Sequence, residues 1–169
     1  YAACVRDKGC EPALEEGYCN AGKADRQKHP INCLAHGQAA RFCTWAGGRL
    51  PSDEEWLTAA GAGDGRPFAW GSEPLSCDRA VWGQTRSGID GCGRASTWPV
   101  CSKPRGNTET GLCDMAGNVK EWTSTLRNIH FIAPSGSWMT EKPEEMRLDW
   151  QHWAVPTLRH YDFGVRCAK

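Results

Sequence analysis

The residues best suited to chemistry lie in the stretch GLCDMAGNVKEW at positions 111–122, which holds two carboxylates, Asp114 and Glu121. Calcium takes about six to eight oxygens from carboxylates, carbonyls and water, and a glycine helps carbonyls converge on one point. One hypothesis is therefore a structural calcium site. The alternative is that backbone N–H groups hold a buried Glu121, while Asp114 makes an Asx turn.

The second group of reactive side chains is the set of ten cysteines. An even count without any C-x-x-C pair argues against zinc ribbons and thioredoxin-like redox sites and favours disulfides. Disulfides persist in oxidising compartments. We therefore expect an extracellular, periplasmic or cell-surface protein. The cysteines are Cys4, Cys10, Cys19, Cys33, Cys43, Cys77, Cys92, Cys101, Cys113 and Cys167.

Size and charge narrow the class of protein. The 169 residues fit one domain, 1–169, which we expect to start upstream of Tyr1 because a short helix over 1–6 is already under way there. Twenty basic residues balance twenty acidic ones, so we expect no nucleic-acid partner. No window approaches the roughly 18 apolar residues of a membrane span, so neither membrane insertion nor a leader is expected within these residues.

The elements that must position these residues are sparse. Apolar spacing predicts a helix near 33–46, and the S-x-x-E capping box of Ser52 and Glu55 predicts one near 53–60. Gly and Pro dominate 62–113, which we expect to be ordered loops. The fold class is α+β, low in regular structure, with a small antiparallel sheet. Its expected strands are 119–124, 130–133, 137–140 and 163–168.

A series of motifs extends over nearly the whole chain: HPINC at 29–33, RFCTWAGGRLPSDEEW at 41–56, FAWG at 68–71, GLCDMAGNVKEWTS at 111–124, SGSW at 135–138 and FGVRCA at 163–168. Their order and spacing resemble the formylglycine-generating enzyme (sulfatase-modifying factor) domain family. The resemblance implies a C-type-lectin-like fold of the formylglycine-generating type, whose N- and C-terminal strands lie close together.

The resemblance also implies a disulfide, because Cys43 and Cys167 fall on two positions that pair in the family. Two further pairs, Cys77 with Cys92 and Cys101 with Cys113, would each close a loop of modest length in the irregular middle. The remaining four cysteines allow three pairings. We favour Cys4 with Cys10 and Cys19 with Cys33.

Calcium ligands follow from the resemblance as well. The family would bind the ion through the side chains of Asp114 and Glu121 and the backbone carbonyls of Gly117 and Val119. A second, weaker site would use Asp90, but Ala80 stands where the family has an asparagine ligand.

The family's oxidase chemistry is not expected here. The formylglycine-generating enzyme holds copper(I) with two thiolates, ligands that suit a soft metal. In this chain the corresponding positions are Thr140 and Glu145, and 136–166 contains no cysteine. We therefore expect no copper and no transfer of that activity. Lys120 replaces a residue that is usually aromatic or small and apolar in the family.

The cysteine-free segment 139–162 is the expected ligand face, as in the variable proteins of diversity-generating retroelements. Trp150 and Trp153 do not match framework positions, and aromatic side chains flanked by Arg147 and acidic residues suit recognition of a protein or glycan. The alternative is that they fill the core. The proposed face comprises Arg147, Trp150, His152, Trp153, His160 and Tyr161. The framework tryptophans, expected in the core, are Trp45, Trp56, Trp70, Trp122 and Trp138.

Other functions have weaker support. His152 and His160, with Asp149 or Asp162, could bind a transition metal. Hydrolase and kinase motifs are missing, as are the EPN, QPD and WND triplets of sugar-binding lectins. We therefore expect a non-catalytic, calcium-stabilised module outside the cytoplasm that recognises a protein or glycan. The alternative is a divergent oxidase or metal-dependent enzyme with a non-thiolate site, or one that requires a partner subunit.

Overall fold

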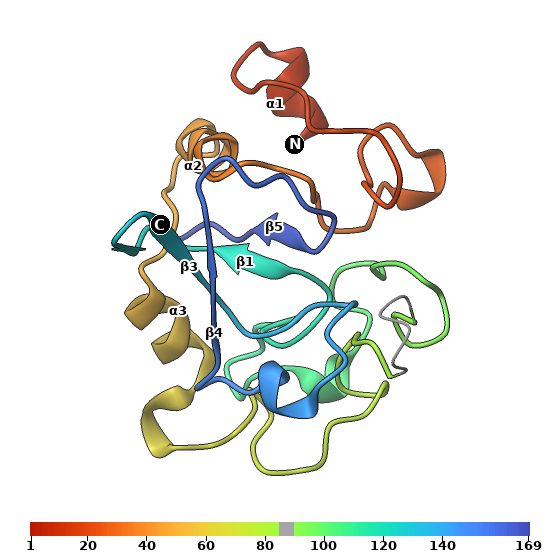
Figure 1. The fold of residues 1–169 in the computed structure, drawn as a ribbon, viewed down its shortest axis with the longest axis vertical. Coiled ribbons are helices and arrows are strands. Elements are labelled where there is room, and N and C mark those ends of the chain that lie inside the picture. The colour runs from red at the N-terminus through yellow and green to blue at the C-terminus, as the bar shows by residue number, and fades with distance from the viewer. Residues whose placement is uncertain (85–89) are drawn as a thin grey trace.

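The computed structural model describes residues 1–84 and 90–169, and its elements are short (Figure 1). The helices are α1 (Ala2–Arg6), α2 (His36–Trp45) and α3 (Asp53–Ala60), with 3-10 turns η1 (Ala24–Arg26), η2 (Ala62–Asp64), η3 (Pro104–Gly106) and η4 (Pro143–Met146). The strands are β1 (Lys120–Trp122), β2 (Leu126–Arg127), β3 (His130–Pro134), β4 (Gln151–Ala154) and β5 (Phe163–Val165). The α+β class with little regular structure is confirmed.

The strands form two small sheets. One has the order β2-β3-β4 and is antiparallel, with Ile132 opposite Trp153. The other pairs β1 with β5 in parallel, with Glu121 opposite Gly164. The expectation of antiparallel pairing alone was therefore wrong. The chain leaves β1, forms the antiparallel sheet, and returns to run beside β1 in the same direction, as parallel pairing requires a long crossover.

Several sequence-based boundaries were also wrong. The segment 137–140 is not a strand: the Thr140 hydroxyl accepts from Ser137 N at 2.8 Å and closes a buried turn. Strand β4 was missed, because QHWA shows no apolar alternation. The helix expected from 33 begins at His36, and β5 ends at Val165. Among the described residues no strand precedes β1, so the expected N-terminal strand is not found beside the C-terminal one.

The main core lies where α2 packs on both sheets. It consists of Ala39, Cys43, Leu50, Trp122, Ala133, Ala154 and Phe163. Trp122 also donates its indole N–H to Leu34 O at 2.9 Å, which satisfies its one polar group. Trp56, Trp122 and Trp138 are buried as expected. Trp45 is not: it ends α2, stacks on Phe42 and leaves 42% of its surface exposed. Trp70 is only partly buried.

All ten cysteines pair, and the five expected disulfides are confirmed. Cys43–Cys167 fastens α2 to the end of the chain across 124 positions. Cys77–Cys92 and Cys101–Cys113 tie the irregular segment 62–113, which wraps the side of the molecule away from α1 and α2 (Figure 1). In the described part of the chain, no helix has the length and hydropathy needed to cross a bilayer.

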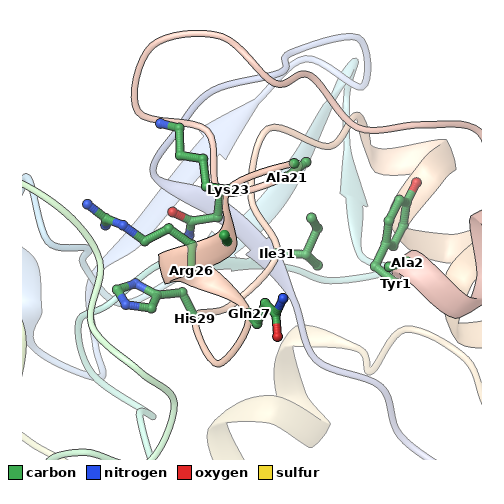
Figure 2. A pocket seen from close by; sticks show the side chains of 11 residues that line it. Tyr1, Ala2, Ala21, Lys23, Arg26, Gln27, His29 and Ile31 are labelled. Carbon is green, nitrogen blue, oxygen red and sulfur yellow. The ribbon is translucent and has the colours of Figure 1, made fainter.

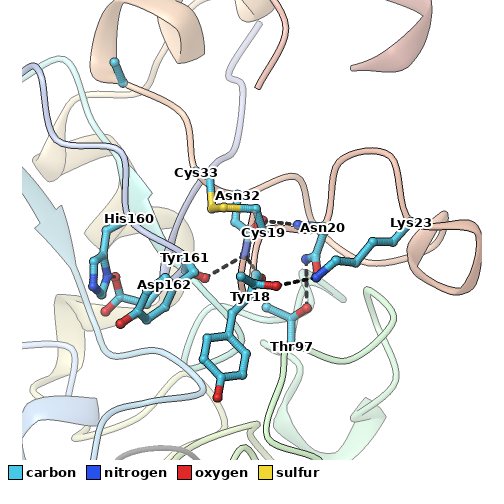
Figure 3. Close-up of a disulfide and its surroundings, with 12 residues drawn as sticks. Tyr18, Cys19, Asn20, Lys23, Asn32, Cys33, Thr97, His160, Tyr161 and Asp162 are labelled. Atoms are coloured by element: carbon cyan, nitrogen blue, oxygen red, sulfur yellow. Dashed lines mark hydrogen bonds and ion pairs between the residues drawn. A yellow bond between two sulfur atoms is a disulfide. The ribbon is translucent and has the colours of Figure 1, made fainter. Parts of the chain in front are cut away.

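The buried amide of Asn32 connects the N-terminal segment to the core (Figure 3). Its Oδ1 accepts from Asn20 N at 2.7 Å, and its Nδ2 donates to Tyr161 O at 2.7 Å. Asn20 in turn donates to Thr97 Oγ1 at 2.8 Å. These bonds, beside the Cys19–Cys33 disulfide, bring residues near 20, 97 and 161 together.

Helix α3 starts as its capping box predicts. Ser52 Oγ accepts from Glu55 N at 3.1 Å, and Glu55 Oε2 accepts from Ser52 N at 2.8 Å. We predict that Ser52→Ala lowers the free energy of unfolding by about 1 kcal/mol, since it leaves a helical N–H without its partner. Urea denaturation measures this loss. Thr58→Ala, later in the same helix, is the control; an equal effect there would contradict the cap's role.

Candidate functional site

The two carboxylates of the 111–122 stretch border one cavity of about 250 Å³. Asp114 lies in a loop after the Cys101–Cys113 disulfide, and Glu121 lies on β1. The cavity is lined by Pro30, Val100, Cys101, Cys113, Asp114, Gly117, Asn118, Val119, Glu121, Val165 and Arg166. All four residues expected to bind calcium therefore face the same space.

Glu121 is a buried carboxylate with strong partners. Arg166 donates to its two oxygens at 2.8 and 2.9 Å, and the Trp56 indole N–H donates to Oε2 at 2.7 Å. Arg166 also donates to Cys113 O at 2.8 Å. The alternative hypothesis was right that Glu121 is buried but wrong about its partners, which are a guanidinium and an indole. Glu121 thus links β1, α3, the chain after β5 and a disulfide.

Asp114 is less well compensated. Its Oδ2 accepts from Cys101 N at 2.8 Å, across the disulfide-closed loop, and makes a longer contact of 3.5 Å with the Asn118 amide. The bond from Cys101 N spans thirteen positions, so it is not an Asx turn. Burial raises the pKa of Asp114 above its usual value. Burial makes this carboxylate costly to ionise, and a bound cation would stabilise its ionised form. Asp114 is therefore a suitable cation ligand.

The donors around the cavity fit calcium in chemical type, because carboxylate and backbone oxygens are the ligands a hard cation prefers. Gly117 and Asn118 both have positive φ, 81° and 62°, which makes the tight turn between the two carboxylates. Arg166 partly offsets the charge of the carboxylates. Cys101 and Cys113 lie within ligand distance of Asp114, but their sulfurs are bonded to each other and offer no thiolate.

The second, weaker calcium site expected at Asp90 has fewer side-chain oxygens among the described residues than the cavity at Asp114. The Asp90 carboxylate accepts from Gly93 N and so caps a turn. Ala80 is buried and contributes no side-chain oxygen. Asp90 directly follows residues 85–89, which the structure does not describe.

The positions of the copper thiolates hold oxygen ligands in this chain. Thr140 is buried and hydrogen-bonded to Ser137, and Glu145 pairs with Lys142 at 3.2 Å. A hydroxyl and a carboxylate do not match the soft ligands of copper(I). The residues here do not fit that metal.

A buried charged cluster lies close to these positions. Lys120 Nζ donates to Asp162 Oδ2 at 2.7 Å, His160 Nδ1 bonds to the other oxygen, and Ser137 Oγ is 3.3 Å from Oδ2. Figure 3 shows the His160 and Asp162 side chains against each other. Burial favours the neutral acid, but the His160 bond and the Lys120 charge hold the pKa of Asp162 at about 2. Asp162 is thus occupied by protein partners.

His152 is the other unusual titratable group. Its Nε2 is buried without a hydrogen-bond partner among the described residues, and its ring makes a T-shaped contact with Trp150. Burial, with a smaller contribution from the Lys120 charge, lowers the pKa of His152 to about 4. The imidazole is therefore neutral near pH 7.

The expected ligand face contains two kinds of side chain. Trp150 and Trp153 are 40% and 54% exposed, which excludes the core-filling alternative. Arg147 is also at the surface, where it forms a two-bond ion pair with Asp149 at 2.8 and 2.9 Å. Tyr161 instead packs edge-on against Tyr18 at 5.4 Å.

The transition-metal hypothesis gains no geometric support. Within residues 1–84 and 90–169, the only group of three potential ligands close enough to share an ion is Cys101, Cys113 and Asp114. Asp149 is paired with Arg147, and Asp162 with Lys120 and His160.

Sequence reasoning missed the ion pairs that organise this region. Arg166 lies 45 positions from Glu121, and Lys120 lies 42 positions from Asp162. Single charges at such distances carry no periodic signal. The one available sign was Lys120, a charged residue at a usually apolar position of the resembling family.

The chain is similar to a known protein family and to several characterised proteins. The sulfatase-modifying factor enzyme 1-like domain matches residues 1–169. The formylglycine-generating enzyme of Mycobacterium tuberculosis is 38% identical over 107 residues, which cover 60% of this chain and 35% of that protein. The inactive C-alpha-formylglycine-generating enzyme 2 of Bos taurus is 34% identical over 113 residues, covering 62% and 36%.

Among solved structures, PvdO from Pseudomonas aeruginosa superimposes with a TM-score of 0.71 at 22% identity, covering 97% of this chain and 73% of that one. At this identity the likeness concerns the fold. The chain spans about a third of the length of the curated relatives it matches, whose names include enzymes and an inactive member. From the match over its whole length, the chain belongs to the sulfatase-modifying factor enzyme 1-like domain family.

Proposed function

We propose that this domain is a non-catalytic recognition module, working outside the cytoplasm, whose Trp150 and Trp153 bind a protein or glycan partner. The observation that carries the proposal is the exposure of these two large aromatics, 40% and 54%, on and beside the edge strand β4. Exposed tryptophans are common energetic centres of recognition surfaces. The five disulfides support a location in an oxidising compartment.

The surroundings of the two tryptophans favour binding. The Arg147–Asp149 ion pair borders Trp150 and supplies a polar rim. His152 lies beside Trp150, and its pKa of about 4 keeps this imidazole neutral at pH 7. An aromatic centre with a polar border is the usual arrangement of a protein interface.

We predict that Trp150→Ala and Trp153→Ala each weaken partner binding by about tenfold or more, since exposed aromatic centres often contribute over ~1.4 kcal/mol. Partners are first selected with an immobilised glycan panel and a random peptide display library, and affinities are then measured by calorimetry. Melting temperatures should stay within about 2 °C, as for other surface changes.

Trp45→Ala is the matched control, because Trp45 is 42% exposed at the end of α2. Equal loss of binding in this control, or no loss in the β4 variants, would contradict the proposed face. A strong fall in melting temperature would show that Trp150 and Trp153 are structural.

We further propose that the Asp114–Glu121 cavity holds a structural calcium ion, with Gly117 and Val119 contributing carbonyl oxygens. Bound there, the ion would neutralise Asp114 and fix the loop that follows the Cys101–Cys113 disulfide. The raised pKa of Asp114 and the presence of two carboxylates, Asp114 and Glu121, in the lining support this. Asp90 remains a candidate ligand of a second, weaker site.

The calcium proposal predicts a higher melting temperature in millimolar calcium than in chelator, by about 2–4 °C for each kcal/mol of binding free energy. Asp114→Asn should remove this shift while leaving the Glu121–Arg166 pair intact. Asp149→Asn, an exposed carboxylate outside the cavity, should retain it. An unchanged shift in Asp114→Asn would rule out this location.

A divergent enzyme is the second candidate, supported by 38% identity to an enzyme of the family. It would need a non-thiolate site, for which Thr140 and Glu145 offer only oxygens. Copper(I) titration with oxygen consumption on a cysteine-containing peptide separates the candidates: stoichiometric uptake with turnover would favour the enzyme and contradict the binding module.

A further inference from the structure

We propose that the groove around Arg26, His29 and Arg94 is a binding site for a tetrahedral oxyanion, the sulfate or phosphate group of a ligand. This site is separate from both the calcium cavity and the β4 tryptophans. It is built by the loop that the Cys19–Cys33 disulfide closes and by the turn that follows Cys92 of the Cys77–Cys92 disulfide.

Two adjoining hollows make the groove. The larger is about 630 Å³ and the smaller about 300 Å³, and both are lined by Arg26 and His29. Figure 2 shows Lys23, Arg26 and His29 side by side at one end of the larger hollow, with Tyr1 and Ile31 toward the other. Arg94 and Ser96 line the smaller hollow. Arg26 and His29 therefore lie where the hollows meet, and Arg94 adds a second guanidinium to the smaller one.

His29 offers a donor to this point in the neutral tautomer whose Nδ1 accepts a hydrogen bond. Asn20 Nδ2 donates to Thr97 Oγ1 at 2.8 Å, so the hydroxyl proton of Thr97 is free to point to His29 Nδ1, also 2.8 Å away. A neutral imidazole that accepts at Nδ1 carries its proton at Nε2. Burial and then the charge of Arg26 lower the pKa of His29, which favours this neutral form.

Arg94 has no carboxylate partner among the described residues, and Arg26 has only one. Arg94 and Lys103 lie 3.8 and 3.7 Å from the centre of the same Trp98 ring, and neither joins an ion pair among the described residues. Burial lowers the pKa of Lys103, Asp78 opposes this shift, and Arg94 adds a smaller lowering, which shows that the two cations repel each other. Arg26 has one carboxylate neighbour, Asp25, which contacts only Nε at 3.2 Å and is 76% exposed. An added anion would relieve this repulsion.

The donor set selects the ligand class. Two guanidinium groups and an imidazole N–H offer several donors, and among the described residues that line the smaller hollow Asp25 is the one carboxylate. Guanidinium forks match the paired oxygens of phosphate-like groups. A cation or a neutral sugar would leave most of these donors unmatched.

The test is calorimetric titration of the intact domain with sodium sulfate and sodium phosphate at constant ionic strength. We expect saturable binding of at least one anion, weakened about tenfold or more in Arg26→Gln and in Arg94→Gln, because each change removes a charge-assisted contact. Arg105→Gln is the control, since Arg105 pairs with Asp78 at 3.7 Å outside the groove. It should bind like wild type.

Arg94→Lys keeps the charge and removes the fork, so intermediate affinity is expected; it also replaces Arg94→Gln should that variant fail to fold by circular dichroism. A heparin-derived disaccharide and glucose 6-phosphate then separate a sulfate ester from a phosphate ester as the ligand, and tighter binding of either supports the site. Absence of saturable binding, or equal weakening in Arg105→Gln, would overturn the proposal.

Discussion

The pairing of all ten cysteines with one another is the constraint on which the rest of the structure depends. Helices and strands here are too short to stabilise a domain through their own hydrogen bonds. A disulfide that closes a loop of about 15 residues is worth roughly 3 kcal/mol in the chain-entropy model, and Cys77–Cys92 closes a loop of that size. The cross-links thus hold loops in place, and they leave no thiolate for a redox metal.

Buried charge complements the cross-links at strand β1. Lys120 and Glu121 are consecutive, so their side chains point to opposite faces of the β1–β5 pair. Lys120 binds Asp162 just before β5, and Glu121 binds Arg166 just after it. Removing one partner of such a pair typically costs about 3–5 kcal/mol. These two pairs define where β5 lies, and with it the position of Cys167 at the end of the chain.

The sequence was most informative where a feature is local or tied to a family pattern. The Ser52 cap and helix α3 follow from four neighbouring residues, and the Cys43–Cys167 bond follows from family positions. Strand β4 depends on its pairing with β3, which its own residues do not reveal. The exposure of Trp45 and the Lys120–Asp162 pair likewise depend on tertiary contacts. At the site, the sequence predicted that Asp114 and Glu121 face the same space. It did not predict the hydrogen bonds that Arg166 and Trp56 donate to Glu121.

A scaffold closed by disulfides is compatible with binding surfaces on its loops, because the loops are held without help from a ligand. The account rests on the cysteines being cross-links, so the most direct test is to count free thiols in the unreduced, denatured protein by alkylation and mass spectrometry. We expect no modified cysteine before reduction and ten after it. Two or more alkylated cysteines before reduction would contradict the account and restore thiolate chemistry as an option.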